Sequence, residues 1–272
     1  MDMRNYSLVL ILVLGFAVST LAQPIAYIGG RDENIISVVN VPTNQVVSIF
    51  ESPLPGSLEG STVSPDSKFI YYTGNGGIIK IDTSNNQIVN QTTLPNNTFA
   101  IQISPDGNTL YTADVLADTV TVLNAADLSV ITTVPVDINP QAITITPDGS
   151  KVYTANLNNA SVSVINTTTN TLITTINLPG ESGTRGICAH PGGQFVYATN
   201  ALSDNVSVID TASNTVVNTI SVGQTPNGIA FSPDGAFGYT ANGSSEDVSV
   251  IRISDNTVID TISNGALVFQ MV

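Results

Sequence analysis

The sequence predicts an all-β fold, a β-propeller whose blades are four-stranded antiparallel sheets. Three observations predict it. A unit of 40 to 44 residues recurs along the chain, each copy holds four short strand-like segments, and no segment has the residue composition of a helix. One tyrosine stands at the same place in every copy: Tyr27, Tyr71, Tyr111, Tyr153, Tyr197 and Tyr239.

The copy that begins at Gln141 shows the elements in order. Its first strand is expected at Gln141–Ile145. The Thr-Pro-Asp-Gly segment that follows suits a type I turn, because proline favours the second position and glycine the fourth. The other strands are expected at Lys151–Ala155, Ser161–Asn166 and Thr171–Leu178, separated by short turns rich in Asn and Thr. Four strands joined in this way form an antiparallel meander, the blade of a propeller.

The motif at the recurring tyrosine resembles that of a known repeat family. YVTN-type β-propeller repeats carry a Tyr-Val-Thr-Asn signature, and similar tetrapeptides stand at Tyr153–Asn156, Tyr197–Asn200 and Tyr239–Asn242. The segment Asn205–Gly223 is similar to that repeat almost throughout, whereas the first two copies lack the final Asn. The family occurs in archaeal surface-layer proteins and exported bacterial proteins. The resemblance therefore implies a binding or structural role more than an enzymatic one.

The phase of the repeat predicts six blades. A chain that starts at Gln23 begins with the second strand of a blade, and the final segment Leu267–Val272 matches Phe99–Ser104, a first strand. The C-terminal strand is therefore expected to join the N-terminal blade. That closes the ring and leaves no open sheet edge. Seven blades remain the alternative, because the better-known rings of the resembled family have seven.

The charge excludes two classes of partner. The net charge is −14 and the chain has only seven Lys and Arg residues, whereas contacts with nucleic-acid phosphates need these side chains. Binding to an anionic membrane surface is excluded for the same reason. Hydrophobic residues make up 42% and charged residues 10% of the chain, which favours a packed core over a disordered chain.

The first 22 residues have the layout of a secretory signal peptide. Arg4 precedes the apolar run Leu8–Val18, and the small residues of Ser19–Ala22 precede a cleavage point before Gln23. We therefore expect a signal peptide at residues 1–22 and a single propeller domain at residues 23–272. The protein is then secreted, at the cell surface or in the periplasm. An uncleaved anchor is the alternative, but the apolar run is short for a membrane span, so no stable insertion is expected after cleavage.

Catalytic groups are scarce in the sequence. His190 is the only histidine and stands at a turn position that holds Ser or Thr in the other copies, so it is interpreted as a turn residue. Cys188, the only cysteine, lies in an apolar segment and is interpreted as a small buried residue. Calcium needs several oxygens at one centre, but the recurring turn aspartates are spread one per blade. They are Asp66, Asp106, Asp148 and Asp234. The sequence predicts no catalytic residue, metal site or cofactor.

One column of residues differs in every copy and is the candidate ligand site. It stands six positions before each turn proline, where the inner strands are expected to begin at one mouth of the central channel. Its members are Glu59, Phe99, Gln141, Arg185 and Asn227, with Leu267 in the last copy. Varied residues that converge on a channel mouth suit a ligand site. Two other interpretations stay open: neutral variation of a loop, and a structural ion pair between Arg185 and Glu59.

The sequence favours an exported propeller without enzymatic activity, a binding scaffold for an unknown protein or glycan partner at the cell surface. One alternative is a propeller hydrolase or lactonase. As in some six-bladed lactonases, it would hold a divalent metal, here through Glu59, Asn227 and a further acid at the channel mouth. A third interpretation is an architectural module of a surface array.

Overall fold

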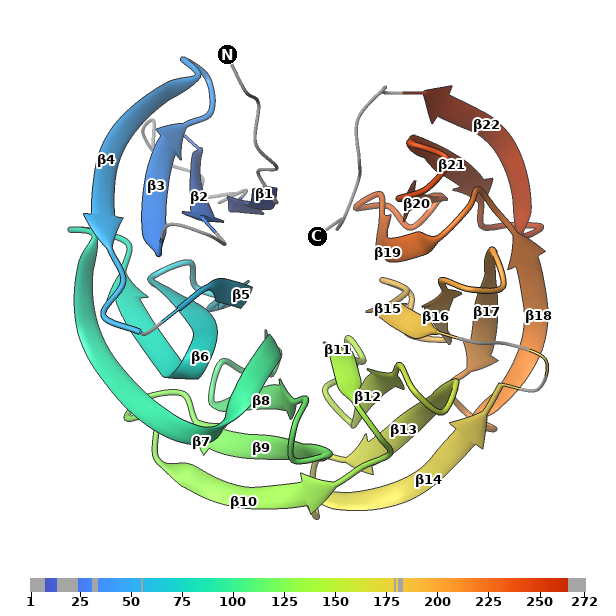
Figure 1. Cartoon of the computed structure of the whole chain (residues 1–272), viewed down its shortest axis with the longest axis horizontal. Coiled ribbons are helices and arrows are strands. Elements are labelled where there is room, and N and C mark those ends of the chain that lie inside the picture. The colour runs from blue at the N-terminus through green and yellow to red at the C-terminus, as the bar shows by residue number, and fades with distance from the viewer. Residues whose placement is uncertain are drawn as a thin grey trace.

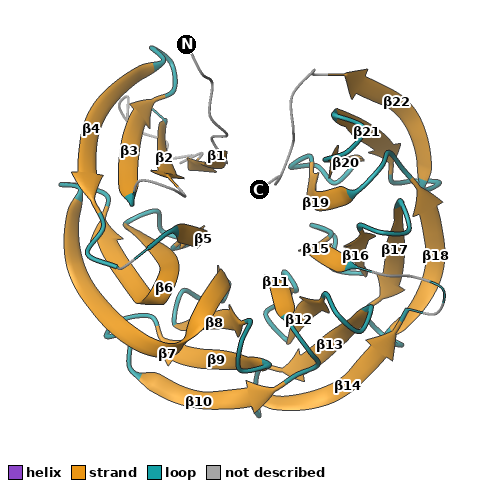
Figure 2. Ribbon diagram, in the orientation of Figure 1, coloured by secondary structure: helices purple, strands orange, loops and turns teal. Residues whose placement is uncertain are grey.

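The computed structural model describes residues 8–13, 24–30, 34–54, 56–178, 180 and 183–263. Every regular element in these ranges is a β-strand. The same ranges contain no helix long and apolar enough to cross a membrane. The strands form antiparallel sheets arranged around one axis, as Figures 1 and 2 show. The prediction of an all-β fold with propeller-like, four-stranded antiparallel blades is confirmed.

Four blades are separate four-stranded sheets that run outward in chain order. The first consists of β1 (Leu8–Val13), β2 (Ile25–Gly30), β3 (Ile35–Asn40) and β4 (Gln45–Glu51). The fourth consists of β11 (Pro140–Ile145), β12 (Lys151–Asn156), β13 (Ser161–Asn166) and β14 (Thr171–Asn177). The fifth consists of β15 (Thr184–Ala189), β16 (Phe195–Asn200), β17 (Asn205–Asp210) and β18 (Thr215–Ser221). The sixth consists of β19 (Pro226–Phe231), β20 (Phe237–Asn242), β21 (Asp247–Arg252) and β22 (Thr257–Ser263).

The second and third blades share one six-stranded sheet, in the order β10-β9-β8-β7-β6-β5. Its strands are β5 (Leu58–Val63), β6 (Phe69–Asp82), β7 (Gln87–Ile103), β8 (Thr109–Asp114), β9 (Thr119–Asn124) and β10 (Val130–Pro135). The two blades are joined because β6 has 14 residues and β7 has 17, so each of these strands serves two neighbours. The last part of β7 pairs with β8 and forms the inner strand of the third blade.

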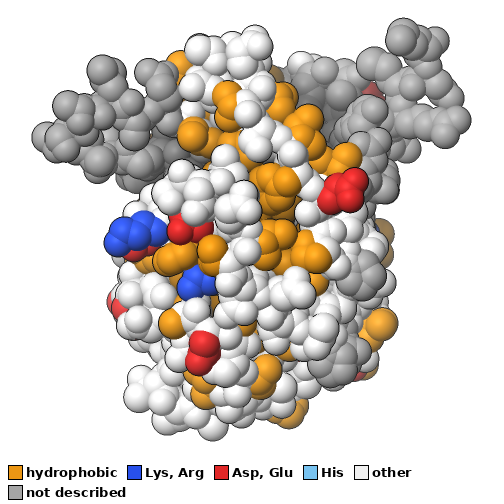
Figure 3. Space-filling model, turned by 90° about the vertical axis from the view of Figure 1, so that its left-hand side faces the viewer, with side chains coloured by type: hydrophobic (Ala, Val, Ile, Leu, Met, Phe, Trp, Pro, Cys, Tyr) orange, Lys and Arg blue, Asp and Glu red, His pale blue; other side chains and the backbone are white. Residues whose placement is uncertain are grey.

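The burial of each strand follows its place in the blade. The second and third strands are buried on both faces, as in β12 and β13, because a neighbouring blade packs on each side. The outer strands are mostly exposed. On β4 the side chains of Val46, Val47 and Ile49 are 55%, 56% and 61% exposed, and Figure 3 shows hydrophobic side chains on this side of the molecule.

The hydrophobic core lies between blades. One cluster joins Tyr27, Ile36 and Val38 of the first blade to Leu58 and Ile79 of the second. Corresponding clusters fill the later interfaces, for example between the fourth and fifth blades. Each β-sheet can bury its apolar faces only against the neighbouring sheets, so burial itself holds the blades side by side.

The recurring tyrosine also carries a hydrogen bond from one blade to the next. Tyr153 donates its hydroxyl to Asn214 Oδ1 at 2.9 Å, and Tyr197 donates to Asn256 Oδ1 at 2.8 Å. The acceptor asparagine lies in the outer turn of the following blade, in the left-handed backbone region, with φ of 53° at Asn214 and 55° at Asn256. Asparagine tolerates this conformation better than most residues. Tyr27 makes the same bond to Asn86.

The predicted closure of the ring at six blades is not confirmed. The described residues supply six blades, and Figure 1 shows them as an open arc with the first and last blades at its two ends. The segment Leu267–Val272, expected to complete the first blade, lies outside the described residues. The inner position of that blade is held by β1, Leu8–Val13, which belongs to the segment expected to be a signal peptide.

One buried carboxylate departs from the repeat. Asp114 is 1% exposed and stands where the fourth blade has Asn156. Four threonine hydroxyls donate to it; they belong to Thr98, Thr112, Thr119 and Thr121. Burial raises the pKa of the Asp114 carboxyl, and the threonine hydrogen bonds partly offset that shift. An amide fits the same place, because Asn156 Nδ2 donates to Ser161 Oγ and Ser163 Oγ at 3.0 Å.

The hydrogen bond between blades can be tested with two matched substitutions. Tyr197→Phe removes the bond to Asn256 and is expected to lower the free energy of unfolding by about 1 kcal/mol. Tyr239→Phe is the control, because no described residue hydrogen-bonds its hydroxyl; the expected change is under about 0.5 kcal/mol. Urea unfolding of both variants measures the difference. Equal losses would show that the bond contributes nothing specific.

Asp114→Asn is expected to raise stability at neutral pH. Folding raises the carboxyl pKa, so the folded protein holds the proton more tightly than the unfolded chain, and stability is lost as pH rises above about 4. The amide does not titrate, so its advantage should shrink as the pH is lowered to 3. Asp234→Asn is the control of opposite sign, because the Ser232 hydroxyl lowers the Asp234 pKa. Urea unfolding at pH 7 and pH 3 checks both, and a pH-independent effect at Asp114 contradicts the expectation.

Candidate functional site

The five residues of the candidate column lie at the same place in five inner strands. Each is the second residue of its strand or, in the long β7, lies at the start of the segment that pairs with β8. They are Glu59 in β5, Phe99 in β7, Gln141 in β11, Arg185 in β15 and Asn227 in β19. Figure 1 shows these inner strands around the axis of the arc. The sixth member, Leu267, lies outside the described residues.

A β-bulge stands at every one of these residues. The pairing of the inner strand with the second strand shifts register between Leu58 and Gly60, the two residues that flank Glu59. The same shift brackets Phe99, Gln141 and Asn227, and a wider one brackets Arg185. A bulge bends the strand and turns the extra side chain away from the regular alternation. The variable residues are therefore also the ones released from the sheet, which sequence reasoning did not foresee.

Glycines beside the column let the inner strands approach closely. A Cβ atom on Gly60 would lie 2.6 Å from the carbonyl oxygen of Phe99 in the next blade, and one on Gly186 would lie 2.7 Å from that of Asn227. Only glycine fits such an approach. Thr73 Oγ1 accepts a hydrogen bond from the backbone N–H of Gly60 at 3.0 Å and donates to the Phe99 carbonyl at 3.2 Å. The bulges are thus fixed against the following blade.

Arg185 and Asn227 are brought together across the interface of the fifth and sixth blades. Arg185 Nη1 donates to Asn227 Oδ1 at 2.9 Å. Asn227 is 8% exposed, whereas Arg185 is exposed to solvent. The ion pair considered between Arg185 and Glu59 is not found among the ion pairs of the described residues. Ser57 Oγ instead donates to Glu59 Oε1 at 2.5 Å. Glu59 is thus oriented by a residue next to its own strand, and Arg185 by a residue of the following blade.

The residues present do not fit a carboxylate-bound divalent metal. Such a site needs several oxygen donors directed at one point. Within the described ranges no group of three or more His, Cys, Asp or Glu residues could hold a metal ion. The Asn227 oxygen already accepts the Arg185 guanidinium, whose positive charge opposes a second cation there. The metal site assumed for a propeller lactonase, with Glu59 and Asn227 among its ligands, is therefore not assembled by these side chains.

The aspartates of the recurring turn serve the turn itself. Ser64 Oγ donates to Asp66 Oδ1 at 2.7 Å, and the backbone N–H of Lys68 donates to the same oxygen at 3.1 Å. The Ser64 hydrogen bond contributes most to lowering the pKa of Asp66 to about 2. His190 takes the place of the serine in its own turn, where Nδ1 accepts the N–H of Gly192 at 3.0 Å. Neither type of residue is part of the candidate column.

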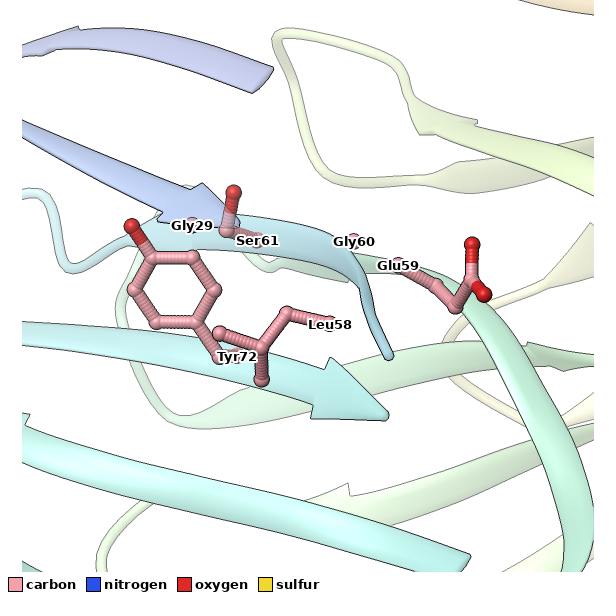
Figure 4. A pocket seen from close by; sticks show the side chains of 6 residues that line it. All are labelled: Gly29, Leu58, Glu59, Gly60, Ser61 and Tyr72. Atoms are coloured by element: carbon pink, nitrogen blue, oxygen red, sulfur yellow. The ribbon is translucent and has the colours of Figure 1, made fainter. Parts of the chain in front are cut away.

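A second feature, missed by sequence reasoning, adjoins Glu59. A small hollow is lined by Gly29, Leu58, Glu59, Gly60, Ser61 and Tyr72 (Figure 4). Ser61 and Tyr72 are directly paired across β5 and β6, and no described residue hydrogen-bonds either buried hydroxyl oxygen. A Cβ on Gly29 would lie 2.9 Å from the Tyr72 ring. In the sequence this hollow could have been found from the doublet Tyr71-Tyr72. In the other copies a smaller residue follows the recurring tyrosine.

In Figure 4 the Glu59 carboxylate lies at the opposite end of the hollow from the Tyr72 ring. The Tyr72 hydroxyl is therefore a feature of the interface between the first two blades more than of the candidate column.

The fold is shared with a solved structure described as Kuenenia stuttgartiensis hydrazine synthase. The identity is 16%, the alignment covers 96% of this chain and 92% of that chain, and the TM-score is 0.81. At this identity the likeness concerns the fold alone. No curated protein sequence matches the chain.

The sequence also matches the profile of a protein family, described as "Lactonase, 7-bladed beta-propeller", over residues 69–175 and 166–264. The match corrects the expectation of a binding scaffold without enzymatic activity and supports the alternative, a propeller hydrolase or lactonase. The assignment to YVTN repeats of surface-layer type is not supported beyond the propeller itself. The two matched ranges together span more than half of the sequence, so the chain belongs to the lactonase family of seven-bladed β-propellers.

Proposed function

We propose that the protein hydrolyses a lactone, a cyclic ester, on the face of the propeller where the inner strands begin and the bulged residues lie. The observation that carries the proposal is the family match over residues 69–264, a range that includes four of the five bulged residues. Glu59 lies outside the matched range and enters on its geometry alone. Bulges next to an axis are a common way to present reactive side chains on a rigid sheet.

Arg185 is suited to stabilising the oxyanion that forms during hydrolysis. Hydrolysis of a lactone passes through a tetrahedral intermediate with a negatively charged oxygen, and donors aimed at that oxygen lower the barrier. The guanidinium presents five N–H donors in a planar group, and Asn227 Oδ1 accepts from one nitrogen only, Nη1. The contact with Asn227 fixes the orientation of Arg185 before the substrate binds, and the other donors of the guanidinium remain for the carbonyl oxygen.

Glu59 is suited to the role of the general base. In the proposed step the carboxylate takes a proton from water, and the water oxygen bonds to the carbonyl carbon of the lactone. The bond from that carbon to the ring oxygen then breaks, and the ring oxygen receives the proton from Glu59. The product is an open-chain hydroxy acid. The Ser57 hydrogen bond to Oε1 orients the carboxylate.

Export of the protein is a separate proposal. It rests on the layout of residues 1–22, in which a basic residue, an apolar run and small residues follow one another. The N-terminal residue of the protein recovered from its native host tests it. A chain that begins at Gln23 outside the cytoplasm agrees with export, and an intact N-terminus inside the cytoplasm contradicts it.

Hydrolysis can be tested with a panel of γ- and δ-lactones and a pH indicator, because each turnover at neutral pH releases one proton. Arg185→Ala and Glu59→Gln are each expected to lower kcat/KM by roughly 100-fold. Because the described residues do not fit a divalent metal, turnover is expected to persist in EDTA.

Arg252→Ala is the matched control for the loss of an arginine. Arg252 pairs with Asp255 on the exposed side of the sixth blade, at 2.6 Å, and its loss should leave turnover unchanged. Two results contradict the proposal. One is the absence of turnover on every lactone in the panel, and the other is an Arg185→Ala variant as active as the unsubstituted protein.

A further inference from the structure

Two of the six second strands in the described chain carry a threonine two residues after the recurring tyrosine. They are β6, with Thr73, and β16, with Thr199. The other blades have a residue without a hydroxyl at this position: Gly29, Ala113, Ala155 and Ala241. The two blades with the threonine are also the two whose bulged residue is ionisable, Glu59 in the second blade and Arg185 in the fifth. The bulged residues of the third, fourth and sixth blades are uncharged.

The hydroxyl of each threonine holds the backbone directly after the ionisable residue. Thr199 Oγ1 accepts the N–H of Gly186 at 2.8 Å and donates to the carbonyl oxygen of Gly186 at 3.4 Å. In the second blade Thr73 Oγ1 accepts the N–H of Gly60 at 3.0 Å. Both threonines are 0% exposed. A buried backbone N–H group needs an acceptor, and at these two bulges a side-chain hydroxyl supplies it.

Glycine is what allows the hydroxyl to reach the backbone. A Cβ on Gly60 would lie 2.9 Å from Thr73 Oγ1, and a Cβ on Gly186 would lie 2.9 Å from Thr199 Oγ1. In the third and fourth blades both members of the pair are alanine, and no hydroxyl is present: Ala100 with Ala113, and Ala142 with Ala155. We refer to Gly60 with Thr73, and to Gly186 with Thr199, as the two Gly–Thr clamps.

In the fifth blade the residue before Arg185 is held as well. Thr184 Oγ1 donates to Asn200 Oδ1 at 3.1 Å, and both residues are 0% exposed. Thr199 and Asn200, adjacent in the second strand, therefore fix Gly186 and Thr184, the two residues that flank Arg185. The tip of the Arg185 side chain is bonded to the sixth blade. The arginine is thus held at its backbone and at its guanidinium, as a side chain with one working direction would be.

We propose that Thr73 and Thr199 are positioning residues, which hold the backbone at Glu59 and Arg185 so that these side chains keep the directions needed to hydrolyse a lactone. The proposal rests on the proposed function for the roles of Glu59 and Arg185. Neither threonine contacts the substrate, and each acts through the bulged residue that its clamp adjoins. A displacement of about 1 Å can cost on the order of 100-fold in rate, so the clamps stand where position matters most.

Kinetics of Thr199→Ala test the clamp of the fifth blade. The third, fourth and sixth blades have alanine at this position, so the variant is expected to fold. Its kcat should fall roughly 10-fold with KM nearly unchanged, because the oxyanion is stabilised in the transition state and not in the bound substrate. Thr199→Ser keeps the hydroxyl and should restore most of kcat.

Thr154→Ala is the matched control for the loss of a buried threonine hydroxyl. Thr154 is 0% exposed and Oγ1 donates to Asn156 Oδ1 at 3.1 Å, but the bulged residue of its blade, Gln141, is uncharged. This substitution should leave kcat unchanged.

Each threonine is expected to act through its own bulged residue alone. Thr199→Ala should lower kcat no further in Arg185→Ala protein, but should have its full effect in Glu59→Gln protein. Thr73→Ala should show the reverse pattern. A loss of activity through general destabilisation would instead have the same size in both backgrounds.

The orientation of Arg185 can be measured without turnover. The chain has four arginines, so ¹⁵N labelling of arginine gives few guanidinium signals, and the signal lost in Arg185→Ala protein belongs to Arg185. Exchange of its N–H hydrogens with water should be faster in Thr199→Ala protein than in the unsubstituted protein. Thr199→Ser should return the exchange to its slow rate.

Two kinetic results would overturn the proposal. One is a kcat of Thr199→Ala equal to that of the unsubstituted protein, and the other is an equal loss in the Arg185→Ala and Glu59→Gln backgrounds. If no lactone is turned over, the proposed function fails, and the exchange of the Arg185 signal decides on positioning alone. Exchange that Thr199→Ala leaves unchanged would then show that the clamp does not position Arg185.

Discussion

The packing of one blade against the next is the interaction on which the rest of the structure depends. A single four-stranded sheet of this size cannot bury its apolar faces alone, and the core clusters of the described chain all span two neighbouring blades or lie at their interface. The recurring tyrosine adds a specific hydrogen bond to this packing, because its hydroxyl donates to the outer turn of the following blade. The asparagine of that turn has a positive φ, and its side-chain oxygen accepts the hydrogen bond from the tyrosine. The repeat is thus conserved within the chain as an interface and not only as a strand pattern.

The candidate site uses the positions at which the inner strands form β-bulges. The bulge at each inner strand releases one residue from the ladder, and the neighbouring glycine or small residue keeps the next inner strand close. The hydrogen bonds of the recurring tyrosines among the described residues involve none of the bulged residues, so the bulged positions can vary while the tyrosine contacts stay the same. Arg185 and Asn227 show what this permits: two residues from different blades meet in a hydrogen bond although neither contributes to the repeat.

Much of the fold could be predicted from residue pattern, and less of the site. The period of the tyrosine and the Pro-Asp-Gly turn were sufficient to place the strands, because both reflect local backbone and burial preferences. The column of Glu59 to Asn227 could be located as variable positions, but the bulges could not, because a bulge depends on how two strands pair. The closure of the ring was predicted from phase alone. It was not confirmed: Leu267–Val272 lies outside the described residues, and β1 (Leu8–Val13) holds the inner position of the first blade. The predicted function, a binding scaffold without enzymatic activity, was wrong. It had been inferred from a motif that belongs to the scaffold, and a scaffold motif does not determine activity.

The Arg185–Asn227 contact links the candidate site to the docking of the sixth blade on the fifth. Stability in an array of similar units is the sum of unit terms and nearest-neighbour couplings, so units with one neighbour fray before those with two. The sixth blade stands at an end of the described arc, and Asn227 belongs to it. Arg185 therefore loses its orienting partner whenever the sixth blade detaches from the fifth. A ligand held by both residues would, by mass action, bind only the docked form and suppress the fraying.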